Sequence, residues 1–184
     1  MRYHNITKAD MLNGDGLRVV LWLSGCSHCC KGCHNPLTWD PDGGLLFDDA
    51  ARDEIFEQLG LPYISGITFS GGDPLHPANV EGVRELIAQI REQFPDKTIW
   101  LYTGSLWEEI RMLPIVQTLD VLVDGEFIEE QKDVKLLWKG SANQRVIDVQ
   151  ATLRSDTPDV PIPHCPDYYT GSMEEGHATC CPFS

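Results

Sequence analysis

The stretch 19–33, VVLWLSGCSHCCKGC, joins a continuously apolar run to a loop that contains four cysteines. A short apolar run without alternation is typical of a strand buried on both faces, as in a parallel sheet covered by helices. The same arrangement, an apolar strand followed by small and polar residues, recurs at 64–74, 98–104 and 121–125. A fifth strand is predicted at 145–149. Together these segments predict one sheet whose polar loops gather at the same edge.

Helices are predicted between these strands. Asp48 or Asp49 can cap the first helix, and Pro77 can open the second, which Pro95 ends. Residues 105–108, SLWE, have the form of a capping box for a short third helix. Strand and helix in alternation indicate βα units with parallel strands.

The chain length limits how many such units fit. A complete eight-fold βα barrel needs about 250 residues, and the chain has 184. We therefore expect an α/β fold, an open partial βα barrel of about five or six parallel strands, with a doubly wound open sheet as the alternative. In both folds ligands bind at the carboxyl ends of the strands. We expect the barrel domain to occupy 1–154, followed by a Cys- and Pro-containing tail, 155–184, with little secondary structure.

Composition narrows the function classes. The hydrophobic fraction of 42% and the charged fraction of 23% are ordinary for a globular protein. The formal net charge of −14 disfavours nucleic acid as a partner. No apolar run is long enough to span a bilayer, and the polar start lacks a signal-type segment, so we expect a cytoplasmic protein with no membrane partner. Seven cysteines in such a chain favour metal or redox chemistry over structural disulfides.

The cysteine loop allows two metal interpretations. Cys26 and Cys29 with Cys30 and Cys33 could form a four-thiolate zinc site, but the two pairs adjoin without the usual intervening loop. Alternatively, Cys26, Cys30 and Cys33 could hold three irons of a [4Fe–4S] cluster and leave the fourth iron open to a ligand. A third possibility is that the thiols are simply buried as small hydrophobic groups. We favour the cluster, with Cys29 as a packing residue or a free thiol.

Further motifs follow the same order along the chain. They are NGDG at 13–16, GCHN at 32–35, SGGDPL at 70–75, WLYTG at 100–104, DVLVDG at 120–125 and WKGSANQR at 138–145. With the cysteine loop, this series resembles the radical S-adenosylmethionine superfamily, and more narrowly the activating enzymes of the anaerobic (class III) ribonucleoside-triphosphate reductase. The resemblance covers residues 3–149. It departs from the family pattern at His34, where Tyr is usual, and at Asp15, where Pro is common.

The resemblance implies an oxidoreductase with two cofactors, a [4Fe–4S] cluster and S-adenosylmethionine. One electron from the reduced cluster would cleave S-adenosylmethionine, and the resulting 5′-deoxyadenosyl radical would take a hydrogen from a glycine of the partner reductase. It further implies a low-potential electron donor such as flavodoxin. Activation of another glycyl radical enzyme of the formate-lyase type, or a zinc-bound interaction module without catalysis, are the alternatives.

The resemblance also assigns residues to the cofactor. Gly71, Gly72 and Asp73 would meet the methionine amino group, because glycine lets backbone carbonyls approach an amine closely. Asp124 could touch the ribose or simply end a strand, and no catalytic residue is expected beyond the cluster and cofactor. The backbone bordering the adenine would come from Gly32, Cys33 and His34.

The tail contains residues whose role the sequence leaves open. A metal site, a disulfide and a tail without either are all compatible with their loose spacing. These residues are His164, Cys165, His177, Cys180 and Cys181.

Overall fold

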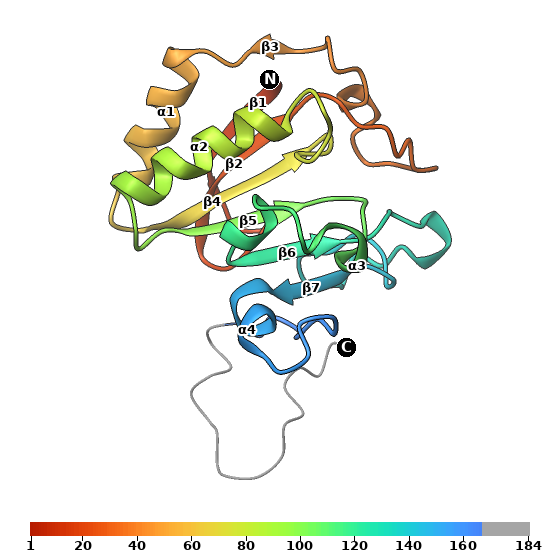
Figure 1. Ribbon diagram of the computed structural model, residues 1–184. Helices are drawn as coiled ribbons and strands as arrows, with labels where there is room; N and C mark the ends of the chain where they lie inside the picture. The colour runs from red at the N-terminus through yellow and green to blue at the C-terminus, as the bar shows by residue number, and fades with distance from the viewer. Residues whose placement is uncertain (167–184) are drawn as a thin grey trace.

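The computed structural model describes residues 1–166, which form a mixed α/β fold around one sheet (Figure 1). The strand order in this part of the chain is β3-β1-β2-β4-β5-β6-β7. Strands β2, β4, β5 and β6 run parallel, whereas β1, β3 and β7 pair antiparallel with their neighbours. The strands are β1 (Arg2–Asp10), β2 (Leu17–Leu23), β3 (Leu45–Leu46), β4 (Ile64–Gly71), β5 (Thr98–Tyr102), β6 (Val121–Asp124) and β7 (Arg145–Asp148).

The expected number of five or six parallel strands is wrong, since only the four central strands are parallel within residues 1–166. The predicted fifth strand exists as β7, but it runs antiparallel to β6, with Asp124 opposite Arg145. A parallel return needs a crossover, usually a helix. The β6–β7 connection contains only the 3₁₀ turn η3 (Glu129–Gln131), so the chain turns back at the same end of the sheet.

Four helices accompany the sheet in the described residues: α1 (Asp49–Leu59), α2 (Val80–Gln93), α3 (Trp107–Ile110) and α4 (Val149–Arg154). The acidic cap of α1 is confirmed, because the Asp48 side chain accepts a hydrogen bond from the Ala51 N–H at 3.0 Å. Helix α2 begins at Val80 rather than at Pro77. The capping box predicted at 105–108 is displaced by one residue, since the Leu106 N–H donates to the Glu109 carboxylate at 3.0 Å. The Trp107 N–H at the start of α3 donates to the Asp124 carboxylate at 2.8 Å.

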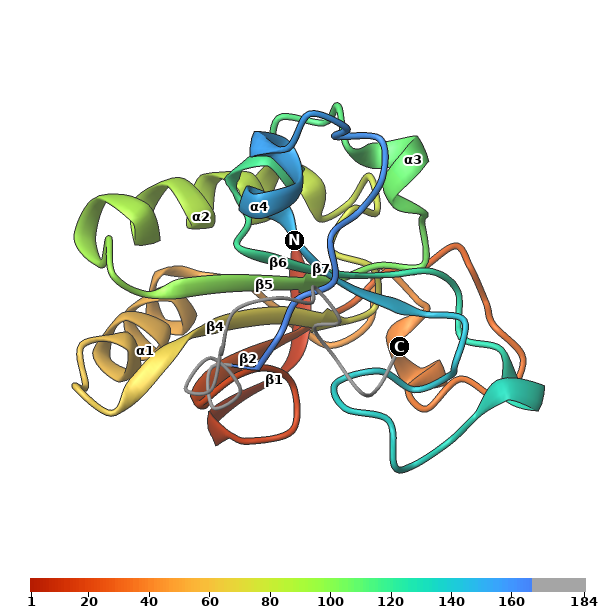
Figure 2. The same cartoon turned by 90° about the horizontal axis from the view of Figure 1, so that it is seen from below.

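One face of the sheet carries the helices. In Figure 2 the sheet is seen nearly edge-on, and α2, α3 and α4 lie on the same side of it. Buried residues of all four helices join alternate residues of the strands in one hydrophobic core. In β5, for example, Ile99 and Leu101 belong to this core, whereas Trp100 belongs to a smaller cluster with Val121 and Trp138. The alternation explains why the central strands are apolar on both faces.

Arg18 lies fully buried within the fold, where its guanidinium ties three strands together. It donates to the Thr68 hydroxyl at 2.9 Å and to the carbonyls of Ile67 and Thr98, both at 2.8 Å. Its guanidinium carbon lies 5.2 Å from the ring centroid of Trp100. Burial lowers the pKa of Arg18 to about 10, and the hydrogen bonds compensate the cost of placing a cation there.

Residues 155–166 follow the outer edge of β7. The Asp148 N–H donates to the Ile162 carbonyl, and the His164 N–H donates to the Val146 carbonyl, both at 2.9 Å. The His164 imidazole contacts Asp15 at 2.6 Å and packs edge-on against Trp100 with ring centroids 5.1 Å apart. This part of the tail therefore covers a sheet edge. Of the candidate ligands in the tail, His177, Cys180 and Cys181 lie outside the described residues.

We expect truncation after Arg154 to destabilise the protein. The loss would uncover the β7 edge and the ring of Trp100, and we expect it to lower the free energy of unfolding by about 3 kcal/mol. Chemical denaturation measures this, with His164→Ala as a partial version that should give a smaller loss. Equal midpoints for the truncated and complete chains would contradict the prediction.

Within residues 1–166 no helix combines the length and the apolar character that crossing a membrane requires.

Candidate iron–sulfur and cofactor site

The cysteine loop leaves the carboxyl end of β2, as the sequence predicts. Its first residues are fixed by the turn that follows, since the Gly25 N–H donates to the Thr38 carbonyl at 2.8 Å and the Cys26 N–H donates to the Trp39 carbonyl at 3.1 Å. The cysteine loop and the β6–β7 loop both lie at the arrowhead end of the parallel strands (Figures 1 and 2). The loop is thus held at the ligand-binding edge of the sheet.

The four thiols of the loop differ in exposure. Cys26, Cys30 and Cys33 are partly buried, whereas Cys29 is exposed. Cys29 also has a left-handed backbone conformation, with φ of 50°. Burial raises the pKa of both the Cys26 and the Cys30 thiol. Metal binding deprotonates such thiols, so these two groups would become thiolates when a metal centre is bound.

A hollow of about 120 Å³ collects the carboxyl ends of four strands. Cys26 and Cys30 line it from the β2 side, and Gly71, Gly72 and Asp73 line it from the β4 side. The ends of β5 and β6 contribute further residues, among them Thr103, Gly125 and Phe127. The structure therefore brings two of the three predicted metal ligands together with the whole predicted methionine turn.

The turn after β4 rests directly on the backbone of the cysteine loop. The Gly72 N–H donates to the Leu23 carbonyl and the Asp73 N–H donates to the Gly25 carbonyl, both at 2.8 Å. Gly71 has φ of +98°, and a Cβ on Gly72 would lie 2.5 Å from the Gly25 oxygen. Glycine is required at position 72 because no side-chain atom fits between the two backbones.

The Asp73 carboxylate is buried and already engaged by protein donors. Its side chain accepts hydrogen bonds from the Leu75 N–H at 2.8 Å and from the Thr103 hydroxyl at 2.9 Å. It also lies 2.7 Å from His28 Nε2. The carboxylate therefore connects the ends of β4 and β5 with the cysteine loop.

His28 is a site residue to which the sequence analysis assigns no role. Its Nε2 faces Asp73, and its Nδ1 lies 3.1 Å from a carboxylate oxygen of Glu126 on the β6–β7 loop. The hydrogen bond to Asp73 is the main cause that raises the pKa of His28 to about 9. The only signal in the sequence is a histidine inside a cysteine loop, because its partners are 45 and 98 residues away.

The residues predicted to border the adenine lie outside the lining of this hollow. A Cβ at Gly32 would lie 2.8 Å from the Glu129 side chain, so the β6–β7 loop covers this glycine. The His34 ring packs against Phe127 with centroids 4.9 Å apart, and Phe127 lines the hollow. Cys33 Sγ accepts a hydrogen bond from the Asn35 N–H at 3.4 Å. These residues thus stand one layer behind the hollow.

The sequence leaves two roles open for Asp124, a contact with the ribose or the end of a strand. In the structure it ends β6 and makes structural contacts. It is fully buried, caps α3 through Trp107 and pairs with Arg145. Arg145 also forms two bonds of 2.8 Å to the Glu108 carboxylate. These bonds lower the pKa of Glu108 to about 2. These ion pairs therefore hold α3 against the carboxyl end of β6 and the amino end of β7.

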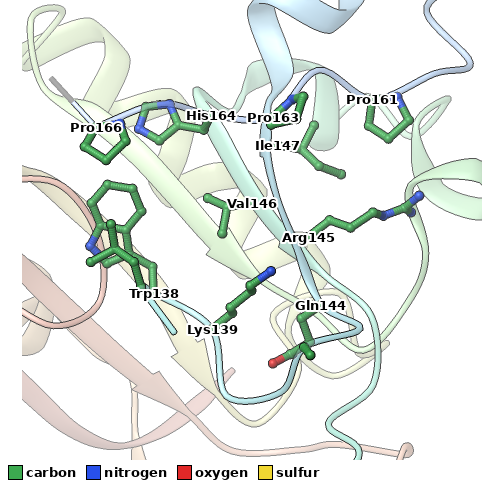
Figure 3. Close-up of a pocket in the computed structure, with 12 residues that line it drawn as sticks. Trp138, Lys139, Gln144, Arg145, Val146, Ile147, Pro161, Pro163, His164 and Pro166 are labelled. Atoms are coloured by element: carbon green, nitrogen blue, oxygen red, sulfur yellow. The ribbon is translucent and has the colours of Figure 1, made fainter. Parts of the chain in front are cut away.

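A larger pocket, about 270 Å³, lies elsewhere, along β7 and the first part of the tail (Figure 3). Trp138, Val146, Pro163 and His164 are among its mostly apolar lining residues, and no cysteine lines it. It shares only Gln144 with the hollow at the cysteine loop. We therefore place the candidate site at the smaller hollow, where the chemistry-bearing residues meet.

The thiol arrangement fits a cluster better than a single ion. Within residues 1–166, no three His, Cys, Asp or Glu side chains converge closely enough to hold one metal ion. A zinc ion requires such convergence of its ligands. In a cluster each thiolate binds a different iron, so ligands spread along one loop are suitable.

A protein-family model identifies the class of protein to which the chain belongs. Residues 12–147 match the family model of the 4Fe-4S single cluster domain. The chain is thus a mixed α/β protein of this iron–sulfur class, which confirms the expectation of a [4Fe–4S] domain.

Similar proteins of known description identify the family. The anaerobic ribonucleoside-triphosphate reductase-activating protein of Haemophilus influenzae is 44% identical over 151 residues, covering 78% of this chain and 96% of that protein. The proteins of the same description from phage T4 and Escherichia coli K12 are 42% and 43% identical, each over 79% of this chain and over 93% and 97% of their own lengths. The chain belongs to the family of anaerobic ribonucleoside-triphosphate reductase-activating proteins, and the predicted resemblance is confirmed.

Proposed function

We propose that this protein is a cytoplasmic radical S-adenosylmethionine activase. It holds a [4Fe–4S] cluster on Cys26, Cys30 and Cys33 and generates a glycyl radical on an anaerobic ribonucleoside-triphosphate reductase. The observation that carries the proposal is the joint hollow of the cysteine loop and the turn at Gly71–Asp73, found in a chain of the activating-protein family. No other arrangement of thiols in residues 1–166 lies at the ligand-binding edge of the sheet.

The chemistry divides between the cofactor and the chain. When bound, the cluster supplies the electron that splits S-adenosylmethionine into methionine and a 5′-deoxyadenosyl radical. The chain would hold three irons through the thiolates of Cys26, Cys30 and Cys33 and would leave the fourth iron without a protein ligand. The buried residues Thr103 and Asp73 are among those that line the hollow in which the cofactor would bind.

Different loops around the hollow would bind different parts of S-adenosylmethionine. Gly71, Gly72 and Asp73 would receive the methionine end, since they line the hollow beside Cys26. The backbone of Gly32, Cys33 and His34 would border the adenine, with Phe127 between His34 and the hollow. In this orientation S-adenosylmethionine, which accepts the electron, would lie beside the cluster, which donates it. This closeness is a proximity effect.

The sheet is suited to a protein substrate if it acts as the open partial barrel of the radical S-adenosylmethionine type. Its four parallel strands and one-sided helices support this architecture. An open barrel gives a loop of the partner reductase lateral access to the hollow. The electron would come from a low-potential donor such as flavodoxin.

The test is reductive cleavage of S-adenosylmethionine by the anaerobically reconstituted protein. With dithionite as reductant, we expect 5′-deoxyadenosine and methionine in equal amounts, and none with the Cys30→Ala variant. A brown, reducible protein that binds S-adenosylmethionine but forms no 5′-deoxyadenosine would contradict the proposal.

A further inference from the structure

We propose that His28 is a positioning residue that fixes the cysteine loop relative to the Asp73 turn and the β6–β7 loop, and thereby shapes the binding site of S-adenosylmethionine. The inference rests on the proposed function, because it concerns the cofactor of that reaction. Its basis is a single side chain that bridges loops from three different strands.

The His28 ring connects several loops of the site. His28 contacts Asp73 through Nε2 at 2.7 Å and Glu126 through Nδ1 at 3.1 Å. Asp73 in turn accepts from the Thr103 hydroxyl, at the end of β5. The imidazole therefore joins the loops after β2, β4 and β6 directly, and it reaches the end of β5 through Asp73. These four strands surround the hollow.

The His28 ring also fits closely into its surroundings. The ring of His28 lies against Gly104, where a Cβ would come within 2.6 Å of two ring carbons. The ring also lines the hollow, and its side chain is only 19% exposed. A ring enclosed by a glycine on one side and two carboxylates at its nitrogens has one available orientation. It is therefore suited to set the position of the loop that carries it.

The Asp73 carboxylate that the ring contacts is itself buried, with the residue only 4% exposed. Its contact with His28 Nε2, at 2.7 Å, reaches it from the cysteine loop, whereas its hydrogen bonds from the Leu75 N–H and the Thr103 hydroxyl come from the ends of β4 and β5. A buried polar group that loses a hydrogen-bond partner is left partly unsatisfied, which is costly. Removal of the ring would therefore loosen the Asp73 turn from the cysteine loop.

Lys31 provides a matched control from the same loop. It also bridges the cysteine loop to the β6–β7 loop, through Glu129 at 3.2 Å and Glu130 at 3.3 Å. Its side chain is 79% exposed and has no contact with Asp73. A general effect of loosening the cysteine loop should therefore appear in Lys31→Ala as well as in His28→Ala.

The experiment compares reconstituted wild type, His28→Ala, His28→Gln and Lys31→Ala. We measure iron content, binding of S-adenosylmethionine, and the change that S-adenosylmethionine causes in the EPR spectrum of the reduced cluster. His28→Ala should retain iron but bind S-adenosylmethionine about 10- to 100-fold more weakly, with the spectral change reduced. His28→Gln should recover part of the affinity because its amide can still donate to Asp73, and Lys31→Ala should match the wild type.

The outcomes separate the inference from the proposed function. Wild-type affinity and an unaltered spectral change in His28→Ala would overturn the inference alone. A wild-type cluster that shows no response to S-adenosylmethionine would instead overturn the proposed function. If His28→Ala loses its iron, the Glu126→Gln variant tests the inference instead. Glu126 is 57% exposed, so we expect its replacement to leave the fold intact. That variant should bind S-adenosylmethionine about threefold more weakly, and unchanged affinity would reject the inference.

Discussion

Alanine at Cys26, at Cys30 or at Cys33 is expected to abolish the cluster, whereas Cys29→Ala should retain about four irons per chain. A cluster with only three protein ligands has none to spare, so the loss of one leaves two irons without protein coordination. Cys29 is exposed and left-handed, and it does not line the hollow. Its thiol is therefore poorly placed to substitute for a missing neighbour.

The measurement is iron and sulfide content after anaerobic reconstitution, together with the visible absorbance. Cys29→Ala is the matched control, since it removes one thiol from the same loop. Loss of the cluster in Cys29→Ala, combined with its retention in any one of the other three variants, would contradict the ligand assignment.

Gly72→Val is expected to disrupt both the fold around the site and the cluster. Sequence reasoning alone places a Cβ at this position against the cofactor. The structure instead places it 2.5 Å from the Gly25 oxygen and 2.9 Å from the Gly25 carbonyl carbon. Backbone atoms cannot move aside, so the turn must separate from the cysteine loop. We expect a loss of about 3 kcal/mol in the free energy of unfolding, with iron content reduced.

Gly60→Ala is the control for this substitution. It lies at the carboxyl end of α1, with φ of −66°, and its added Cβ would come no closer than 3.4 Å to another residue. Its unfolding midpoint and iron content should therefore equal those of the wild type. A Gly72→Val protein with the same midpoint and iron as Gly60→Ala would show that the two backbones are not in the contact described.

The elements that the sequence predicts well are those with a local signal. The apolar run at β2, the Asp48 cap of α1 and the glycines at 71 and 72 each follow from neighbouring residues. The sequence prediction omits β1, which is mostly polar and half-buried or exposed, and β3, which consists of only two exposed leucines. Local pattern therefore identified the parallel centre of the sheet and the strand β7, but not the antiparallel strands β1 and β3 at the other edge.

The parts that the sequence could not predict depend on distant partners. The direction of β7 is set by the connection from β6 rather than by the residues of β7 itself. The role of His28 depends on Asp73 and Glu126, and the role of Asp124 depends on Arg145 and the start of α3. Spacing along the chain contains no information about such contacts. The cysteine ligands and the glycine turn could be proposed without them, but the polar network that joins these two motifs could not.

The most direct test of the account is EPR spectroscopy of the cognate anaerobic reductase after activation. The reduced protein, S-adenosylmethionine and the reductase are mixed anaerobically, and cluster and cofactor are quantified in the same sample. The account predicts a glycyl radical doublet on the reductase, absent when Cys30→Ala replaces the wild type. Absence of the doublet with cluster, cofactor and reductase all present would contradict the proposed function.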